Sequence, residues 1–124
     1  MPQDPSTALL RILYVEDDNL VREITCDLLS RESREVVAVA TGEEALSVFQ
    51  ESRFDILVTD VSLPAMSGTE LVRRVKQIAP EVPVILASGY RFEVDQLRLG
   101  PNVQTIVKPF DAPQIDALIS DLCI

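Results

Sequence analysis

The chain has 124 residues, which fits one domain that can bury a core without a disulfide or a structural metal. Its 20 acidic and 11 basic residues give a net charge of -9, and a surface this acidic repels nucleic acid and anionic lipid. The chain has no histidine, which excludes a Ser-His-Asp triad and a histidine-ligated metal site, and its two cysteines, Cys26 and Cys123, lack metal-ligand spacing.

The start of the chain carries no pattern of export or membrane insertion. Residues 1–8 (MPQDPSTA) have neither the basic start nor the apolar core of a signal peptide. No apolar run approaches the roughly 20 residues that a membrane-spanning helix needs. We therefore expect a cytoplasmic protein, with a flexible tail over residues 1–10 and one domain over residues 11–124.

Short apolar runs rich in β-branched residues alternate along the chain with amphipathic stretches. The runs predict five strands, at residues 12–15, 36–39, 56–59, 84–87 and 105–107. Helical stripes follow four of them, and their members are Leu20, Ile24 and Leu28; Ala45, Val48 and Phe49; Leu71, Val72, Val75 and Ile78; Ile115, Leu118, Ile119 and Leu122. Residues 91–99 give only a poor stripe before the Gly-Pro-Asn break at 100–102, so we expect a short or mobile helix there.

Three of the predicted helices begin with capping residues. Thr41 precedes Glu44 by three positions, and Ser67 precedes Glu70 by three, which is the spacing of a capping box. The last helix has Asp111 as a cap, with Gln114 three residues on. These signals fix where the helices start.

The alternation of five strands with five helices predicts an α/β fold. The strands are nearly continuous in apolar character, as expected when a parallel sheet is covered on both faces. We predict a doubly wound five-stranded parallel sheet of the flavodoxin-like (βα)5 type, with strand order 2-1-3-4-5.

Polar residues follow four of the predicted strands, at the edge where doubly wound sheets bind their ligands. They are residues 16–18 (Glu, Asp, Asp), Asp60, Ser88 and Lys108. The four strands are neighbours in the predicted order, so we expect these side chains to converge. Each residue alone is compatible with a helix cap or a solvated loop charge, and for Asp18 we favour the cap. Together they favour a functional site.

Carboxylates gathered at one edge repel one another. At about 4 Å and an effective dielectric constant of ~20, each pair costs about 4 kcal/mol. A hard divalent cation such as Mg²⁺ would offset that cost, and Lys108 would neutralise part of the remainder. An Asp carboxylate is a competent nucleophile toward phosphorus and has no proton to lose. The pattern therefore favours phosphoryl transfer, with the Ser88 hydroxyl as a hydrogen-bond donor.

Four segments of the chain resemble the receiver domains of bacterial response regulators and hybrid histidine kinases. They are ILYVEDDN at 12–19, TDVSLPAMSG at 59–68, VPVILASGY at 82–90 and IVKPF at 106–110. The resemblance runs from about Arg11 to the C-terminus. The second segment and the ASGY sequence at 87–90 are more similar to hybrid-kinase receivers.

The resemblance implies a role in a two-component phosphorelay for each site residue. Asp60 matches the phosphoacceptor, which would receive its phosphoryl group from a histidine of a kinase or a histidine phosphotransfer protein. Glu16 and Asp17 match the acidic pair at a Mg²⁺ site, with Mn²⁺ as an alternative ion. Asp17 would be a direct ligand beside Asp60, with Glu16 acting through water. The backbone carbonyl of Ser62 matches a further ligand.

The same resemblance assigns the residues that contact the phosphoryl group. Ser88 matches the hydroxyl residue that binds a phosphoryl oxygen, and Lys108 matches the lysine that does the same. The bond between Lys108 and Pro109 is typically cis in receivers. We expect a domain that switches protein–protein interactions and catalyses only its own phosphorylation and dephosphorylation. It would not bind nucleic acid or a membrane directly.

Three positions depart from the family pattern or stand beside the site. Glu16 occupies a position where Asp is commonest. Thr105 stands where many receivers carry a Tyr or Phe that turns inward on phosphorylation. Without that ring, the usual switch between the Ser/Thr and the aromatic residue cannot operate in its usual form. Tyr90 would shield the site or would be an ordinary surface aromatic.

Other functions remain open from the sequence. A phosphorylation-independent interaction module would keep the fold and work through surface contacts. A haloacid-dehalogenase-like phosphatase requires a second Asp two residues after its nucleophile, but Asn19 stands two residues after Asp17. A flavodoxin would need a hydroxyl- or Gly-rich phosphate loop where the acidic EDDN run lies. The sequence leaves open the kinase, the output partner, a phosphorylation-dependent homodimer, and whether the domain is a stand-alone regulator or part of a hybrid kinase.

Overall fold

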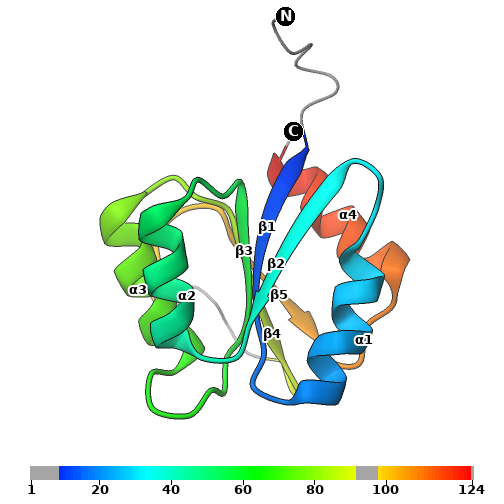
Figure 1. Ribbon diagram of the computed structural model, residues 1–124, viewed down its shortest axis with the longest axis horizontal. Helices are drawn as coiled ribbons and strands as arrows, with labels where there is room; N and C mark the ends of the chain where they lie inside the picture. The colour runs from blue at the N-terminus through cyan, green and yellow to red at the C-terminus, as the bar shows by residue number, and fades with distance from the viewer. Residues whose placement is uncertain (1–8, 92–97, 124) are drawn as a thin grey trace, which may run out of the picture.

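The computed structural model describes residues 9–91 and 98–123 and contains one five-stranded parallel sheet (Figure 1). The strands lie in the order β2-β1-β3-β4-β5, so the predicted fold class and strand order are confirmed. Their bounds are β1 (Leu10–Val15), β2 (Arg34–Val39), β3 (Ile56–Asp60), β4 (Val84–Ser88) and β5 (Val103–Val107).

The described helices cover both faces of the sheet. They are α1 (Asn19–Leu29), α2 (Gly42–Glu51), α3 (Gly68–Ile78) and α4 (Ala112–Cys123). Figure 1 shows α2 and α3 on one face, with α1 and α4 on the other. The helix expected within residues 91–99 falls almost wholly on residues 92–97, which lie outside the described part of the chain. Most of the predicted tail, residues 1–8, also lies outside it, and Leu10 is the first residue of β1.

The sheet separates two hydrophobic cores. Successive side chains of a strand point to opposite faces, so Leu13 and Val15 pack with α2 and α3, whereas Ile12 and Tyr14 pack with α1 and α4. Every residue of β3 and β4 is buried. These central strands therefore form a rigid base for the residues that follow them.

The predicted caps are present at their helices. The Glu44 amide donates a hydrogen bond to Thr41 Oγ1 (3.0 Å), and the Glu70 amide donates one to Ser67 Oγ (3.1 Å). Asp111 and Gln114 exchange two reciprocal bonds, at 2.9 and 2.8 Å. No helix among the described residues is both long and apolar enough to span a membrane.

The strand register brings four strand ends to one edge of the sheet. Thr59 of β3 pairs with Val15 of β1, Asp60 pairs with Ala87 of β4, and Ser88 pairs with Val107 of β5. The residues that follow these pairs must therefore emerge side by side. The edge strand β2 ends in Val39 and contributes no charged group there.

Gly68 allows the start of α3 to lie directly on the end of β3. The Gly68 amide donates a hydrogen bond to the carbonyl of Val61 (2.8 Å). A β-carbon at position 68 would lie only 1.9 Å from the carbonyl oxygen of Asp60. Any other residue would therefore push α3 away from Asp60.

Tyr14 places a buried hydroxyl between β1 and α1. Tyr14 is 3% exposed, and its hydroxyl lies beside the side chain of Thr25, which is also buried. Burial disfavours the phenolate and is the main reason why the pKa of Tyr14 rises to about 12. The negative charges of Glu16 and Asp60 act in the same direction.

We predict that Gly68→Ala destabilises the domain by about 1–3 kcal/mol or more, because the backbone must shift to relieve the contact with Asp60. Gly89→Ala is the matched control, since its β-carbon would meet no atom within 4 Å, and it should change stability by less than about 0.5 kcal/mol. Urea unfolding of the three proteins measures both values. Equal stability of the two variants would contradict the close approach.

We predict that Tyr14 makes stability depend on alkaline pH. An unfolded tyrosine ionises near pH 10.0, whereas folded Tyr14 keeps its proton up to about pH 12. The contribution of the neutral Tyr14 side chain to the free energy of unfolding is therefore complete below about pH 10 and is lost as the pH rises toward about 12. Tyr14→Phe cannot ionise, so its free energy of unfolding should fall less steeply over this range in urea titrations. Parallel slopes for the two proteins would show that the hydroxyl is not linked to folding.

Candidate functional site

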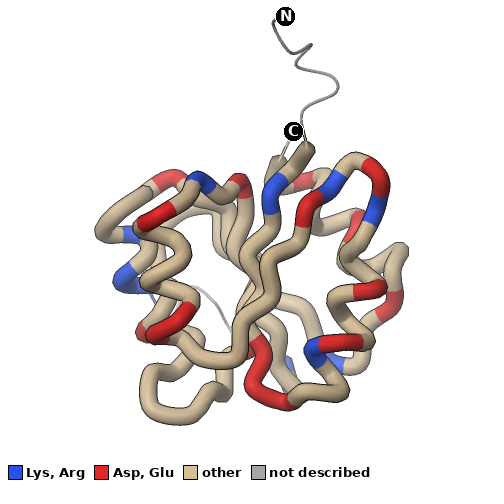
Figure 2. The backbone as a smooth tube through the Cα atoms, in the orientation of Figure 1, with Lys and Arg blue, Asp and Glu red and all other residues tan. Residues whose placement is uncertain are grey.

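Three carboxylates meet at the edge where β1 and β3 end. Glu16 and Asp17 follow β1 directly, and Asp60 is the last residue of β3. One oxygen from each lies within 4.8 Å of the others. Glu16 is 2% exposed and Asp60 8%, whereas Asp17 is open to solvent. Figure 2 shows this acidic run at the carboxyl end of β1.

Lys108 bridges the two buried carboxylates. Its ammonium nitrogen donates hydrogen bonds to Glu16 Oε1 (2.9 Å) and Asp60 Oδ2 (3.0 Å). Burial alone would lower the pKa of Lys108, but the bonds and charges of its two partners outweigh burial and raise it. Lys108 therefore carries its charge at neutral pH and offsets part of the repulsion between the acids.

Ser88 lies beside the cluster at the end of β4. It is 3% exposed, and its hydroxyl oxygen accepts a hydrogen bond from the Tyr90 amide (3.2 Å). Its carbonyl accepts one from the Lys108 amide (2.7 Å), which holds the end of β5 against β4. The bond between Lys108 and Pro109 is cis, as the resemblance led us to expect. Tyr90 itself is 66% exposed.

Ser62 lies two residues beyond Asp60, in the loop that leads to α3. Its side chain is exposed, and it stands between the end of β3 and the close contact of Gly68. The structure thus brings Glu16, Asp17, Asp60 and Lys108 into one cluster, with Ser88 and Ser62 on the adjoining strand end and loop.

Asp18 caps α1. Its Oδ1 accepts a hydrogen bond from the Val21 amide (2.9 Å), which confirms the interpretation of this acid as a helix cap. The Asp18 amide in turn donates a hydrogen bond to Glu16 Oε2 (3.2 Å). Both oxygens of Glu16 therefore have protein donors, one from Asp18 and one from Lys108.

Two residues of this region were missed by sequence reasoning. Gly68 closes the segment from 59 to 68, and a glycine directly after a capping serine is the signal that could have identified its close approach to Asp60. Arg22 donates a hydrogen bond from Nη1 to the carbonyl of Glu16 (2.8 Å). Nothing in the pattern of α1 marks that contact, because Arg22 occupies an ordinary polar position of an amphipathic helix.

The donor set of the cluster fits a hard divalent cation. All three converging side chains offer carboxylate oxygens, which Mg²⁺ and Mn²⁺ accept readily, and the set contains no sulfur or imidazole ligand. The open position of Asp17 leaves room for water on the solvent side of such an ion. The chemistry of the residues is therefore compatible with the metal that the resemblance implies.

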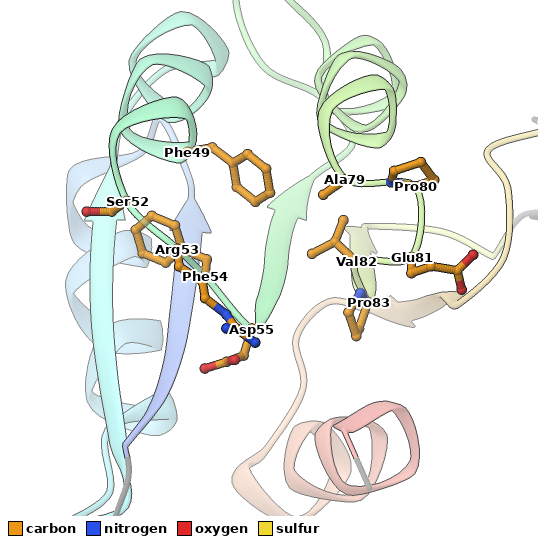
Figure 3. A pocket seen from close by; sticks show the side chains of 10 residues that line it. All are labelled: Phe49, Ser52, Arg53, Phe54, Asp55, Ala79, Pro80, Glu81, Val82 and Pro83. Carbon is orange, nitrogen blue, oxygen red and sulfur yellow. The ribbon is translucent and has the colours of Figure 1, made fainter. Parts of the chain in front are cut away.

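A separate hollow of about 460 Å³ lies at the opposite end of the sheet (Figure 3). Phe49, Phe54 and Val82 line it, and Arg11 stacks on Phe54 with its guanidinium carbon 4.6 Å from the ring centre. Asp55 and Pro83, which also line it, precede β3 and β4. This hollow therefore does not face Asp60.

Comparison with known proteins identifies the family. Residues 12–120 match the family described as the response regulator receiver domain. The response regulator protein FleR of Pseudomonas aeruginosa is 34% identical over 113 residues, which cover 89% of this chain and 24% of FleR. The chain likewise spans only 46% to 51% of several other curated relatives.

Solved structures of receiver domains have the same fold. The receiver domain of the hybrid histidine kinase CckA is 30% identical with a TM-score of 0.78, covering 92% of this chain and 99% of that one. The response regulator TrrA of Thermotoga maritima, solved in complex with Mg²⁺ and BeF, is 26% identical with a TM-score of 0.82, covering 92% and 99%. The chain belongs to the response regulator receiver domains of two-component signalling systems.

Proposed function

We propose that Asp60 accepts a phosphoryl group from a histidine of a histidine kinase or a histidine phosphotransfer protein. The observation that carries the proposal is the placement of the Asp60 carboxylate, buried at a strand end with Lys108 Nζ 3.0 Å away and two further acids beside it. Family membership supports the same assignment.

The chemistry requires little from the protein beyond position and charge. Asp60 Oδ2 is held by Lys108, which leaves Oδ1 to attack the phosphorus of phosphohistidine. A P–O bond forms as the P–N bond breaks, and the imidazole nitrogen leaves with the electron pair. Lys108 stabilises the negative oxygens of the phosphoryl group, and the Ser88 hydroxyl donates a hydrogen bond to one of them.

Asp17, Asp60 and the backbone carbonyl of Ser62 would hold a Mg²⁺ ion, with Glu16 acting through water. The engagement of both Glu16 oxygens by Lys108 and the Asp18 amide supports that indirect role. When bound, the ion neutralises charge on the phosphoryl oxygens. TrrA, which is similar to this chain, was solved with Mg²⁺, and Mn²⁺ would meet the same ligand preference.

The domain would act as a signalling phosphoacceptor and not as an enzyme that turns over a free metabolite. It would catalyse only its own phosphorylation and the later hydrolysis of the aspartyl phosphate. Its net charge of -9 argues against direct contact with nucleic acid or an anionic membrane. The output would be a change in protein–protein contacts, with a phosphorylation-dependent homodimer among the candidates.

An apolar surface beside Lys108 supports a protein as the phosphoryl donor. Leu20 and Ile24 of α1 are 65% and 53% exposed. A hollow of about 390 Å³ next to them is lined by Ile24, Phe110 and Lys108, among others. Exposed apolar side chains so close to the reacting residues fit a partner that lays an apolar helix face on α1 while its histidine reaches Asp60.

A second candidate function is an interaction module that works without phosphorylation. Thr105 favours it, because this half-buried residue of β5 replaces the aromatic side chain that many receivers move on activation. The intact cluster around Asp60 weighs against it. An affinity for the partner that is the same with and without phosphorylation would support this second function.

We predict that Asp60→Asn abolishes Mg²⁺-dependent labelling of the domain by acetyl phosphate, measured by intact-protein mass spectrometry. Asp18→Asn is the matched control, because Asn caps a helix as well as Asp does, and Asp18 caps α1 and is not one of the three acids that converge at the site. The control should label at close to the wild-type rate. Labelling of Asp60→Asn at another carboxylate, to the same extent as the wild type, would contradict the assignment of Asp60 as the phosphoacceptor.

A further inference from the structure

We propose that Arg22 is a positioning residue, which holds the loop after β1 in the shape that presents Asp17 to the cation. This inference rests on the proposed function and adds a residue to it. Arg22 lies one turn into α1, and its amide donates to the carbonyl of Asp18 (2.9 Å) as part of the helix. Its side chain turns back toward the end of β1.

The guanidinium of Arg22 joins the two sides of the loop. Nη1 donates a hydrogen bond to the carbonyl of Glu16 (2.8 Å), and Nη2 donates one to Oδ1 of Asn19 (2.6 Å). The first contact lies before Asp17 and the second after Asp18. A guanidinium can hold two acceptors in one fixed plane, which a single ammonium cannot do.

Asp17 obtains its position through its backbone. The peptide group before it is held by Arg22 at the Glu16 carbonyl, and the one after it is held by the Asp18 amide bonding to Glu16 Oε2. Within residues 9–91 and 98–123, no group donates a hydrogen bond to the Asp17 carboxylate, although its oxygen lies within 4.8 Å of those of Glu16 and Asp60. Loosening either peptide group would therefore let the carboxylate leave the cluster.

The charge of Arg22 and its geometry have opposite consequences for cation binding. A fixed positive charge repels a divalent cation, so its removal should tighten Mg²⁺ binding if charge were the dominant effect. Loss of the two Arg22 hydrogen bonds should weaken Mg²⁺ binding, because Asp17 must then be ordered when the ion binds. Partners that orient metal ligands are worth about 10- to 100-fold in affinity. Whether Mg²⁺ affinity rises or falls when Arg22 is replaced therefore separates the effect of its charge from the effect of its hydrogen bonds.

The test is Mg²⁺ titration of the 124-residue chain followed by backbone NMR shifts, with wild type, Arg22→Met, Arg22→Lys and Arg74→Met compared. We expect the dissociation constant to rise about 10-fold in Arg22→Met and by a smaller factor in Arg22→Lys, which can keep one of the two bonds. Arg74→Met is the control, because Arg74 pairs with Glu70 on the exposed surface of α3. It should bind Mg²⁺ as the wild type does.

A phosphorylation assay supplies the second readout. Labelling of Arg22→Met by acetyl phosphate should require about 10-fold more Mg²⁺ for half-maximal rate and approach the wild-type rate when Mg²⁺ saturates. Unchanged or tighter Mg²⁺ binding in folded Arg22→Met would overturn the Arg22 proposal alone. If Arg22→Met fails to fold, a Mg²⁺ affinity equal to that of the wild type in Arg22→Lys overturns the Arg22 proposal equally. A wild type that neither binds Mg²⁺ nor labels would overturn the proposed function with it.

Discussion

The site depends on one interaction, the bridge that Lys108 makes between Glu16 and Asp60. Two buried carboxylates at one sheet edge are unfavourable unless a positive charge lies between them. Lys108 supplies that charge with two hydrogen bonds, to partners 92 and 48 residues away in the sequence. A parallel sheet in this strand order makes the bridge feasible, because the ends of β1, β3 and β5 all open on the same edge.

Rigid placement of the acids follows from the packing beneath them. The end of β3 is enclosed by buried neighbours, and α3 starts against Asp60 because Gly68 has no side chain. The loop after β1 is held differently, by polar contacts from Asp18 and Arg22. One acid is thus fixed by close packing, whereas Asp17 is fixed by hydrogen bonds to its neighbouring peptide groups. Only the second arrangement is easy to loosen without unfolding the sheet.

Much of this arrangement could be predicted from the sequence. Apolar runs identify the central strands reliably because both faces of β3 and β4 are covered, so every residue of each is buried. Three strands were predicted too short at their starts: β1 begins at Leu10, β2 at Arg34 and β5 at Val103. Polar residues such as Arg11, Arg34 and Gln104 interrupt the apolar run at these starts and still join the ladder, so the hydrophobic pattern does not mark them.

Contacts made by long side chains were harder to predict. The convergence of Asp60 and Lys108 follows from strand order alone, which is why the sequence predicts it. The return of Arg22 onto the carbonyl of Glu16 depends on rotamers and on the path of the loop, which residue types do not specify. The burial of the Tyr14 hydroxyl beside Thr25 has the same origin, since Tyr14 looks like any other apolar strand residue in the sequence.

The proposed function rests on Asp60 as the phosphoacceptor of a working receiver. Backbone NMR shifts recorded with beryllofluoride and Mg²⁺, which together mimic an aspartyl phosphate, test it most directly on wild type and Asp60→Asn. We predict shifts in the wild type alone, centred on Asp17, Asp60, Ser88 and Lys108. Identical shifts in both proteins, or no Mg²⁺-dependent change in either, would contradict it.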